Sequence, residues 1–280
     1  MILDAHHHVW RYRPEDYGWI GPGMESLARD FEVKDLAAIA GPLGVSGSVV
    51  VQARQSIEET EWLIELAGQS DFVRGVVGWA PLANPSVGEL LDKWSDDSKL
   101  CGVRHVVQDE PDEGFLARDD FNRGVAEVVR RGLTYDVLIF AQQLPAAIQF
   151  VDSHPEGRLV LDHLGKPPVK AGQIEPWRYQ LEELAERPNV ACKLSGLVTE
   201  ADWKAWTPDS IRPYLDAALE AFGPDRLMFG SDWPVCLLAT SYERWVEVIQ
   251  DWAGRLSPNE QASFFHSAAT RSYQLPGASA

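Results

Sequence analysis

Short runs of β-branched and other apolar residues recur along the chain, and each is followed by a longer stretch with apolar residues at helical spacing. The runs predict buried strands over residues 2–10, 47–54, 73–81, 100–107, 134–139, 158–165, 190–196 and 226–234. The longer stretches predict helices over 31–43, 56–67, 86–94, 115–131, 144–154, 177–187, 210–222, 242–253 and 258–267. This alternation predicts an α/β fold, a parallel (β/α)8 TIM-like barrel.

A doubly wound open sheet is the main alternative for the same alternation. The first predicted strand is not followed by Gly-x-Gly-x-x-Gly, so the usual signature of a dinucleotide-binding fold is missing. No Pro/Gly-rich linker divides the chain, and we expect one barrel domain over residues 1–280 with a short C-terminal tail. Ser56 and Glu59 also predict a capping box at the start of one helix.

Charge and cysteine content narrow the partners and the location that we expect. The 42 acidic and 25 basic residues give a formal charge of −17, which argues against broad attachment to nucleic acid or an anionic membrane. The chain starts without a basic leader and has no apolar run near the roughly 20 residues of a membrane span, so we expect no export signal or anchor. Three widely spaced cysteines suit a reducing cytoplasm. The oligomeric state stays open.

Polar residues that a buried strand would not normally carry lie at the C-terminal ends of the predicted strands. In a parallel barrel these ends meet at one mouth. Buried ionisable groups are costly unless they are paired or bound to metal, so the ring predicts a functional site. For Asp162, orienting His163 or capping a turn explains the residue as well as a direct role does. The ring consists of His6, His8, Gln52, Arg54, Arg104, His105, Asp162, His163, Ser195 and Asp232.

The histidines of the first predicted strand suggest a metal or an acid–base centre. Strand alternation would turn His6 and His8 into the mouth and His7 toward the packing between barrel and helices. A purification-tag remnant is the alternative, but an apolar strand precedes this short His run.

Three imidazoles and one carboxylate, from His6, His8, His163 and Asp232, would suit one divalent metal, Zn or Mn, which would activate a water molecule. Without metal, Asp232 could act as general base while the imidazoles and Arg104 stabilise an oxyanion. The catalytic residues that we expect are the same on both routes: Asp232, His163, His6, His8 and Arg104.

Aromatic and polar side chains near the strand ends would form the walls of the binding pocket. The arginines suit a negatively charged substrate or product, although ion pairs with neighbouring carboxylates explain each one equally well. The expected substrate-binding residues are Trp10, Tyr17, Trp19, Gln52, Arg54, Trp79, His105 and Trp233.

An ordered series of motifs resembles one known family across nearly the whole chain. It comprises Asp4–Tyr12, Val51–Arg54, Gly102–His105, Leu161–Pro167, Lys193–Gly196 and Phe229–Pro234. Together these segments resemble the amidohydrolase-related (amidohydrolase 2) family, and within it the sugar lactonase branch of the L-fuconolactonase and L-rhamnonolactonase type.

The resemblance implies a hydrolase of carbohydrate metabolism that opens a sugar-acid lactone to the hydroxy acid with an activated water molecule. It also implies that the metal is optional, because members of this branch lack the carboxylated lysine of two-metal amidohydrolases. Here Arg104 and His105 stand at the end of the fourth predicted strand, where that lysine would be. One segment departs from the pattern: residues 264–269 replace the usual Gly-Gly-Asn-Ala turn, and His266 is expected to be a helix-end residue rather than a ligand.

Two other functions remain as alternatives. Related barrels carry out metal-dependent decarboxylation, or other hydrolysis of a small cyclic or aromatic acid, with a similar set of His and Asp. A non-enzymatic sugar-binding barrel would account for the aromatic loops, but it gives no reason for three His and one Asp at one mouth.

Overall fold

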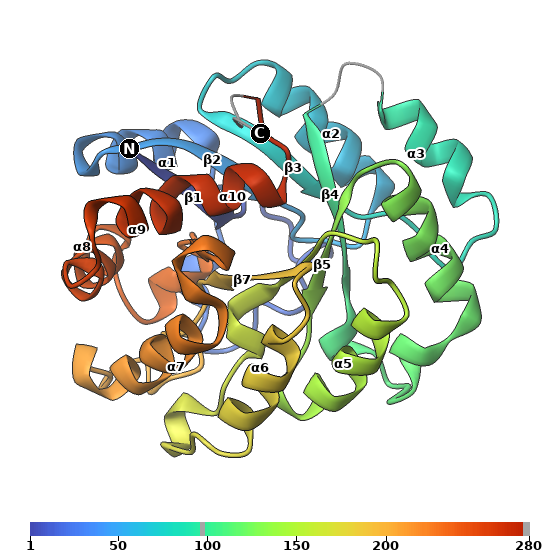
Figure 1. The fold of residues 1–280 in the computed structure, drawn as a ribbon. Coiled ribbons are helices and arrows are strands. Elements are labelled where there is room, and N and C mark those ends of the chain that lie inside the picture. Colours follow the sequence, from blue (N-terminus) through green and yellow to red (C-terminus); the bar gives the residue numbers. More distant parts are fainter. Residues whose placement is uncertain (96–98, 277–280) are drawn as a thin grey trace.

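Parallel strands form the centre of the molecule, and helices surround them (Figure 1). The structure is a computed structural model that describes residues 1–95 and 99–276. Within these residues, eight strands pair in the order β1 to β8. Their bounds are β1 Ile2–His7, β2 Val45–Val51, β3 Val73–Gly78, β4 Leu100–Val106, β5 Thr134–Leu138, β6 Leu159–Leu161, β7 Val190–Leu194 and β8 Leu227–Phe229.

Backbone hydrogen bonds join the first strand to the segment after the last one. The His8 amide donates to the Trp233 carbonyl (2.6 Å), and the Asp232 amide donates to the His6 carbonyl (2.8 Å). The sheet therefore curls back on itself, and the predicted (β/α)8 barrel is confirmed.

The helices follow the predicted pattern, and most differences are confined to their ends. They are α1 Val33–Ala40, α2 Ile57–Gly68, α3 Val87–Ser95, α4 Asp119–Arg130, α5 Leu144–Asp152, α6 Trp177–Ala185, α7 Pro208–Arg226, α8 Tyr242–Ala253, α9 Pro258–Ala262 and α10 Ala268–Ser272. A π-helical turn, Ser263–Ser267, separates α9 from α10. No helix in the described part of the chain is long and apolar enough to cross a membrane.

Strands β6 and β8 are shorter than predicted. Each ends just before a short segment, 162–165 or 230–232, in which the backbone departs from the extended conformation. His163 and Asp232 in these segments have positive φ angles of 54° and 56°, which a strand cannot accommodate. The strand predictions were wrong at these positions because the backbone of His163 and Asp232 is not extended.

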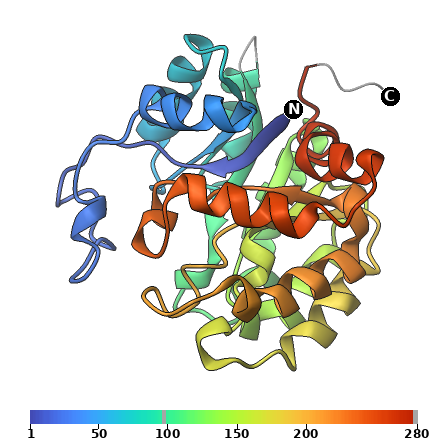
Figure 2. The same ribbon diagram turned by 90° about the vertical axis from the view of Figure 1, so that its left-hand side faces the viewer.

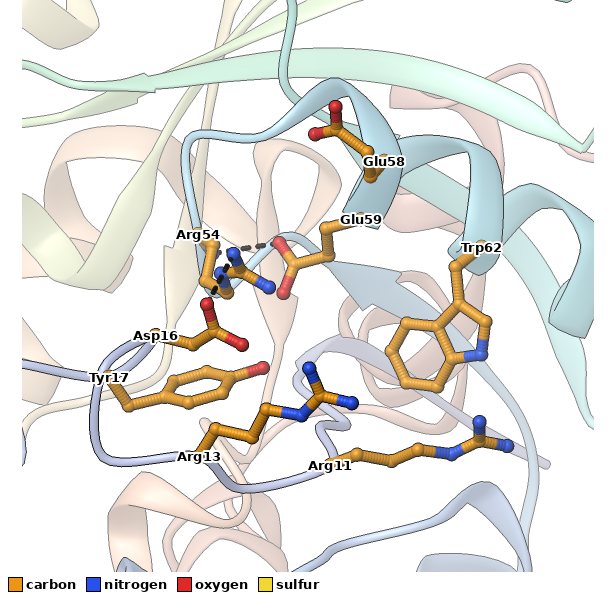
Figure 3. Close-up of a pocket in the computed structure, with 8 residues that line it drawn as sticks. All are labelled: Arg11, Arg13, Asp16, Tyr17, Arg54, Glu58, Glu59 and Trp62. Atoms are coloured by element: carbon orange, nitrogen blue, oxygen red, sulfur yellow. Dashed lines mark hydrogen bonds and ion pairs between the residues drawn. The ribbon is translucent and has the colours of Figure 1, made fainter.

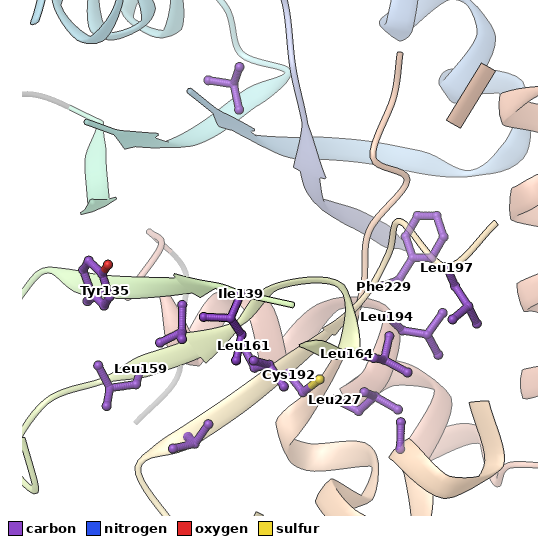
Figure 4. Packing of buried hydrophobic residues seen from close by; sticks show 14 of the residues in the cluster. Tyr135, Ile139, Leu159, Leu161, Leu164, Cys192, Leu194, Leu197, Leu227 and Phe229 are labelled. Atoms are coloured by element: carbon purple, nitrogen blue, oxygen red, sulfur yellow. The ribbon is translucent and has the colours of Figure 1, made fainter. Parts of the chain in front are cut away.

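Apolar side chains pack in two places. One cluster lies between the strands and the surrounding helices, and Figure 4 shows part of it, including Leu161, Leu194 and Phe229. A smaller cluster inside the barrel includes Leu3, and α10 and the residues after it contribute to this cluster. Figure 2 shows α10 beside the start of β1, so this helix covers the end of the barrel where the strands begin.

The segment that departs from the family pattern lies at this covered end. His266, in the π-helical turn, lines a hollow together with Met1 and Arg74. The Thr270 hydroxyl donates to the His266 carbonyl (2.9 Å). Because β1 begins here, the unusual segment lies at the opposite end of the barrel from His6 and His8.

The predicted capping box at the start of α2 is only half formed. The Ser56 hydroxyl accepts from the Glu59 amide (3.2 Å), as expected. The Glu59 carboxylate instead accepts from the amides of Ala53 (3.0 Å) and Arg54 (2.7 Å). These two donors follow β2 and lack partners in the sheet, so the carboxylate satisfies them rather than the Ser56 amide.

Candidate active site

A cavity of about 360 Å³ opens at the C-terminal ends of the strands. We call it the catalytic pocket. Six of the predicted site residues line it: His8, Trp19, Gln52, Arg104, His163 and Asp232. The other lining residues are Met24, Ala53, Val106, Gln108, Asp109, Leu138, Lys166, Thr199, Glu200, Trp203, Val235 and Leu238.

His8 and Asp232 line this pocket, and His6 lies fully buried beside them. The Nε2 atoms of His6 and His8 lie 3.2 Å apart. Asp232 Oδ1 lies 3.4 Å from His8 Nε2 and 3.8 Å from His6 Nε2. We call these residues the upper cluster. These three atoms are close enough together to hold one metal ion.

The upper cluster has the dimensions of a tetrahedral metal site. Zn–N bonds of about 2.0–2.1 Å put neighbouring ligand atoms roughly 3.3 Å apart. The three observed separations, 3.2, 3.4 and 3.8 Å, bracket this value. Of the four residues expected to bind metal, His6, His8 and Asp232 thus form one group, whereas His163 groups with His6 and Asp162.

Neighbouring groups fix the orientation of two imidazoles. His8 Nδ1 lies 2.8 Å from the Val51 carbonyl, which can only accept, so His8 carries its proton on Nδ1 and presents a lone pair on Nε2. His163 Nδ1 lies 2.9 Å from the Ser195 hydroxyl. At Gly196, a Cβ atom would lie 2.5 Å from His163 Nδ1, so the imidazole packs directly against the backbone.

His6 connects the catalytic pocket to buried charges beneath it. Its Nδ1 lies 3.3 Å from Asp162 Oδ1 and 3.1 Å from Lys193 Nζ. Arg104 lies beside the same imidazole and donates to Asp162 Oδ2 (2.8 Å). Its second terminal nitrogen donates to the Gln52 carbonyl (2.6 Å).

A second set of charges is sealed below the first. We call Asp136, Lys193 and Tyr273 the lower cluster. Lys193 Nζ lies 2.5 Å from Asp136 Oδ2, and the Tyr273 hydroxyl lies 2.8 and 2.9 Å from the two Asp136 oxygens. Lys193 and Asp136 are fully buried and Tyr273 is nearly so. Each Asp136 oxygen therefore has a donor beside it, and Lys193 Nζ also lies 2.9 Å from Asp162 Oδ1.

Burial and neighbouring charges shift the pKa values of the site residues. Burial lowers the pKa of His163 to about 4, so the imidazole is neutral at physiological pH. Burial alone would raise the pKa of Asp232, but His163, His8 and Lys166 outweigh it and hold the value below the ordinary range. Likewise, Lys193, His6 and Arg104 overcome the effect of burial on Asp162 and keep its pKa well below normal. Asp232 is therefore ionised and able to accept a proton.

Most of the residues expected to form the walls lie elsewhere. Trp10 is fully buried, and its indole donates to the Arg29 carbonyl (2.9 Å). Trp233 is also buried and packs its edge against Phe31. In the sequence, a Trp that packs in the core looks the same as a Trp that lines a pocket. The sequence therefore did not distinguish buried Trp10 and Trp233 from exposed Trp19.

The remaining expected residues point away from the catalytic pocket. The Trp79 indole donates to His105 Nδ1 (3.2 Å), and His105 Nε2 lies 2.6 Å from a Glu110 oxygen. Tyr17 and Arg54 line a different hollow beside the mouth. Arg54 follows β2, but its side chain pairs with Asp16 (2.8 Å) instead of entering the barrel.

Sequence reasoning missed several residues that line the pocket. Lys166 follows β6 within a motif that was recognised, yet it was not assigned a role. Glu200 lies 3.8 Å from Lys166 Nζ. Thr199 and Trp203 come from the loop after β7, and loops at this end of a barrel commonly carry function. The position of this loop, directly after a predicted strand, was the sequence feature that could have identified Thr199 and Trp203.

Comparison with known proteins identifies the family. The sequence profile described as amidohydrolase matches residues 3–275. The chain belongs to the amidohydrolase family. The upper cluster of imidazoles and a carboxylate therefore lies in an amidohydrolase barrel.

Three relatives within this group are similar to the chain over almost its whole length. A Burkholderia multivorans L-fucono-1,5-lactonase is 46% identical over 287 residues, covering 99% of this chain and 97% of that protein. A Burkholderia ambifaria L-fucono-1,5-lactonase is 34% identical, covering 98% and 95%. A crystal structure of a Burkholderia multivorans amidohydrolase with bound zinc superposes with a TM-score of 0.94 at 45% identity, covering 99% of this chain and 100% of that one.

Proposed function

We propose that this amidohydrolase is a lactonase that opens a sugar-acid lactone, of the L-fucono-1,5-lactone type, to the hydroxy acid. The observation that carries the proposal is the convergence of Asp232 and His8, which line the catalytic pocket, with the buried His6 beside them. Two relatives named L-fucono-1,5-lactonase, at 46% and 34% identity, support the choice of substrate.

The residues of the pocket suit attack by water on a lactone carbonyl. Asp232 is ionised and takes a proton from a water molecule, while the oxygen of that water molecule bonds to the lactone carbonyl carbon. The ring C–O bond then breaks, and Asp232 returns the proton to the departing alkoxide. Lys166 supplies positive charge for the oxyanion and then for the product carboxylate. Gln52 Nε2 is buried without a hydrogen-bond partner among the described residues, and we assign it to a substrate oxygen.

The upper cluster would hold one divalent metal, zinc or manganese. His6, His8 and Asp232 supply two imidazole nitrogens and a carboxylate oxygen with suitable spacing. A solved relative contains zinc, which supports this assignment. When bound, such an ion supplies Lewis acidity toward the lactone carbonyl and lowers the pKa of a water molecule.

A panel of sugar lactones tests the proposal. Proton release is followed with a pH indicator for L-fucono-1,5-lactone, L-rhamnono-lactones and unrelated aldonolactones. We expect turnover above the spontaneous rate, highest for a six-membered L-fucono lactone. Absence of turnover for every member would contradict the proposal.

Metal content and carbon dioxide release separate the remaining alternatives. The same panel is run on protein that has been treated with a chelator, before and after zinc or manganese is added back. We expect bound metal by elemental analysis and a rate that falls on chelation. Carbon dioxide release from hydroxybenzoates, or lactone binding without turnover, would instead favour the decarboxylase or the sugar-binding alternative.

Two wider expectations remain proposals. We propose one barrel domain over the chain, supported by a single sheet that includes strands from both ends of the sequence. We also propose a cytoplasmic location, supported by Cys101, Cys192 and Cys236, which are all free thiols.

A further inference from the structure

A second hollow of about 240 Å³ lies beside the catalytic pocket (Figure 3). We call it the arginine pocket. One side comes from the loop after β1 and the other from the segment between β2 and the first turns of α2. Its lining residues are Arg11, Arg13, Asp16, Tyr17, Arg54, Glu58, Glu59 and Trp62. The proposed reaction uses none of them.

One wall of the arginine pocket contains a buried carboxylate with an unsatisfied oxygen. Glu59 is only 4% exposed. Its Oε2 accepts the amides of Ala53 and Arg54, whereas Oε1 has no hydrogen-bond partner within residues 1–95 and 99–276. Figure 3 shows the carboxylate directed toward the space above Arg13 and Tyr17. Burial raises the pKa of Glu59 to about 7. A ligand hydroxyl would complete the hydrogen bonding of this group.

Two of the three arginines carry unbalanced positive charge. Arg54 is already paired with Asp16 (2.8 Å). Arg11 and Arg13 have no ion pair to any carboxylate in the described part of the chain, and both are exposed on the pocket side of the loop. Guanidinium groups bind carboxylates through two parallel hydrogen bonds, so this pair favours an anionic ligand group.

An aromatic surface lies next to these charges. The Arg11 guanidinium lies 5.7 Å from the centre of the Trp62 ring, and Trp62 is half-buried. A flat indole at the edge of a polar hollow suits the C–H face of a carbohydrate. The pocket thus combines guanidinium groups, a buried hydroxyl acceptor and a stacking surface.

We propose that the arginine pocket binds a polyhydroxylated carboxylate, with Arg11 and Arg13 on the carboxylate, Glu59 Oε1 on a hydroxyl and Trp62 against the carbon chain. This is the chemistry of an open-chain sugar acid. That the ligand is the ring-opened product of this same protein rests on the proposed function.

A third hollow links this site to the catalytic pocket. It has a volume of about 430 Å³ and shares Asp16 and Arg54 with the arginine pocket. It shares Trp19, Ala53 and Asp109 with the catalytic pocket. The arginine pocket and the catalytic pocket are therefore connected by the residues of one intervening hollow.

Calorimetric titration of the full chain tests the proposal. The ligands are sodium L-fuconate and sodium D-gluconate, and the comparison ligands are the neutral polyol L-fucitol and inorganic phosphate. We expect two aldonate binding events for the wild-type protein and one for the double variant Arg11→Gln, Arg13→Gln. Loss of these charged hydrogen bonds should weaken the affected event by about tenfold or more. Trp62→Leu should weaken the same event by a smaller factor.

Arg244→Gln is the matched control, because Arg244 is an exposed arginine of α8 whose nearest carboxylate, on Glu247, is 3.9 Å away. It should bind aldonate as the wild type does. A wild-type binding curve for the Arg11, Arg13 double variant would overturn the site. Equal affinity for L-fucitol would overturn the anionic part of the assignment, and equal affinity for phosphate would overturn the polyhydroxylated part.

Lactone turnover measured on the same samples separates the two proposals. We expect the double variant to keep the wild-type kcat, because Arg11 and Arg13 do not reach the catalytic pocket. If the protein turns over lactone but has no aldonate site that depends on Arg11 and Arg13, this inference is overturned and the proposed function stands. An aldonate site in a protein that turns over no lactone leaves this inference standing and overturns the proposed function.

Discussion

The upper and lower clusters are both buried groups of charged and polar residues inside one barrel, yet they are organised in opposite ways. In the upper cluster, His6 Nε2, His8 Nε2 and Asp232 Oδ1 converge as a set of atoms that could hold a metal ion. In the lower cluster, the Lys193 ammonium and the Tyr273 hydroxyl donate to Asp136. The first arrangement offers three atoms that a cation can bind, whereas the donors of the second already satisfy Asp136. This difference separates residues that react from residues that hold the barrel together.

Asp232→Asn gives the largest expected loss of activity. Asparagine keeps the shape of the side chain but cannot accept the proton, so we expect lactone kcat to fall by about 10² to 10⁴. The thermal midpoint should stay close to that of the wild type. The exposed Asp251→Asn, on α8, is the control and should leave both quantities unchanged. A wild-type rate for Asp232→Asn would remove the distinction between the clusters.

Lys193→Met should give the largest loss of stability. It leaves the Asp136 carboxylate buried without its cation, and breaking a buried ion pair in this way costs about 3–5 kcal/mol. Urea unfolding measures the change in the free energy of unfolding. Adding Asp136→Asn should recover part of the loss, because the amide can still accept from Tyr273 and carries no charge. A cost below about 1 kcal/mol, typical of a surface pair, would mean that the lower cluster is not structural.

Tyr273→Phe tests the lower cluster more gently. It removes a hydroxyl that lies 2.8 and 2.9 Å from the oxygens of Asp136. Hydrogen bonds to charged groups contribute about 1.5–3 kcal/mol, so we expect a loss of that size in urea unfolding with kcat unchanged. Tyr179→Phe, at a residue that is 66% exposed, should have no effect. A fall in kcat without a change in stability would place Tyr273 with the reacting residues.

Ser195→Ala should give the smallest effect, and it should appear in activity rather than stability. The Ser195 hydroxyl lies 2.9 Å from His163 Nδ1 and orients the imidazole toward the catalytic pocket. Loss of such an orienting partner typically lowers activity about 10- to 100-fold. Steady-state kinetics should show this fall in kcat/KM, and Ser195→Thr, which keeps the hydroxyl, should restore part of it. Equal rates for Ser195→Ala and the wild type would mean that packing against Gly196 alone positions His163.

Local patterns predicted much of this site. The expectation that His6 and His8 share one side and His7 faces away is confirmed, because the Nε2 atoms of His6 and His8 lie 3.2 Å apart while His7 Nε2 lies 2.9 Å from the Ser48 hydroxyl. The position of Asp232 at the end of a predicted strand correctly predicted that it lies at the mouth. The same reasoning failed for Arg54, whose long side chain turns outward to Asp16. A strand-end position determines where the backbone lies but not where a flexible side chain ends.

By itself, the sequence determined the alternation of strands and helices, the barrel and the ring of polar residues at its mouth. These follow from the periodicity of apolar residues, which is a local property of the chain. Only the tertiary structure decided that Asp136 and Lys193 form a fully buried ion pair while Asp232 and His8 face a cavity. It also decided that Trp10 is core while Trp19 lines the pocket. The reason is that each of these outcomes depends on distances and exclusion of water between segments that are remote in sequence.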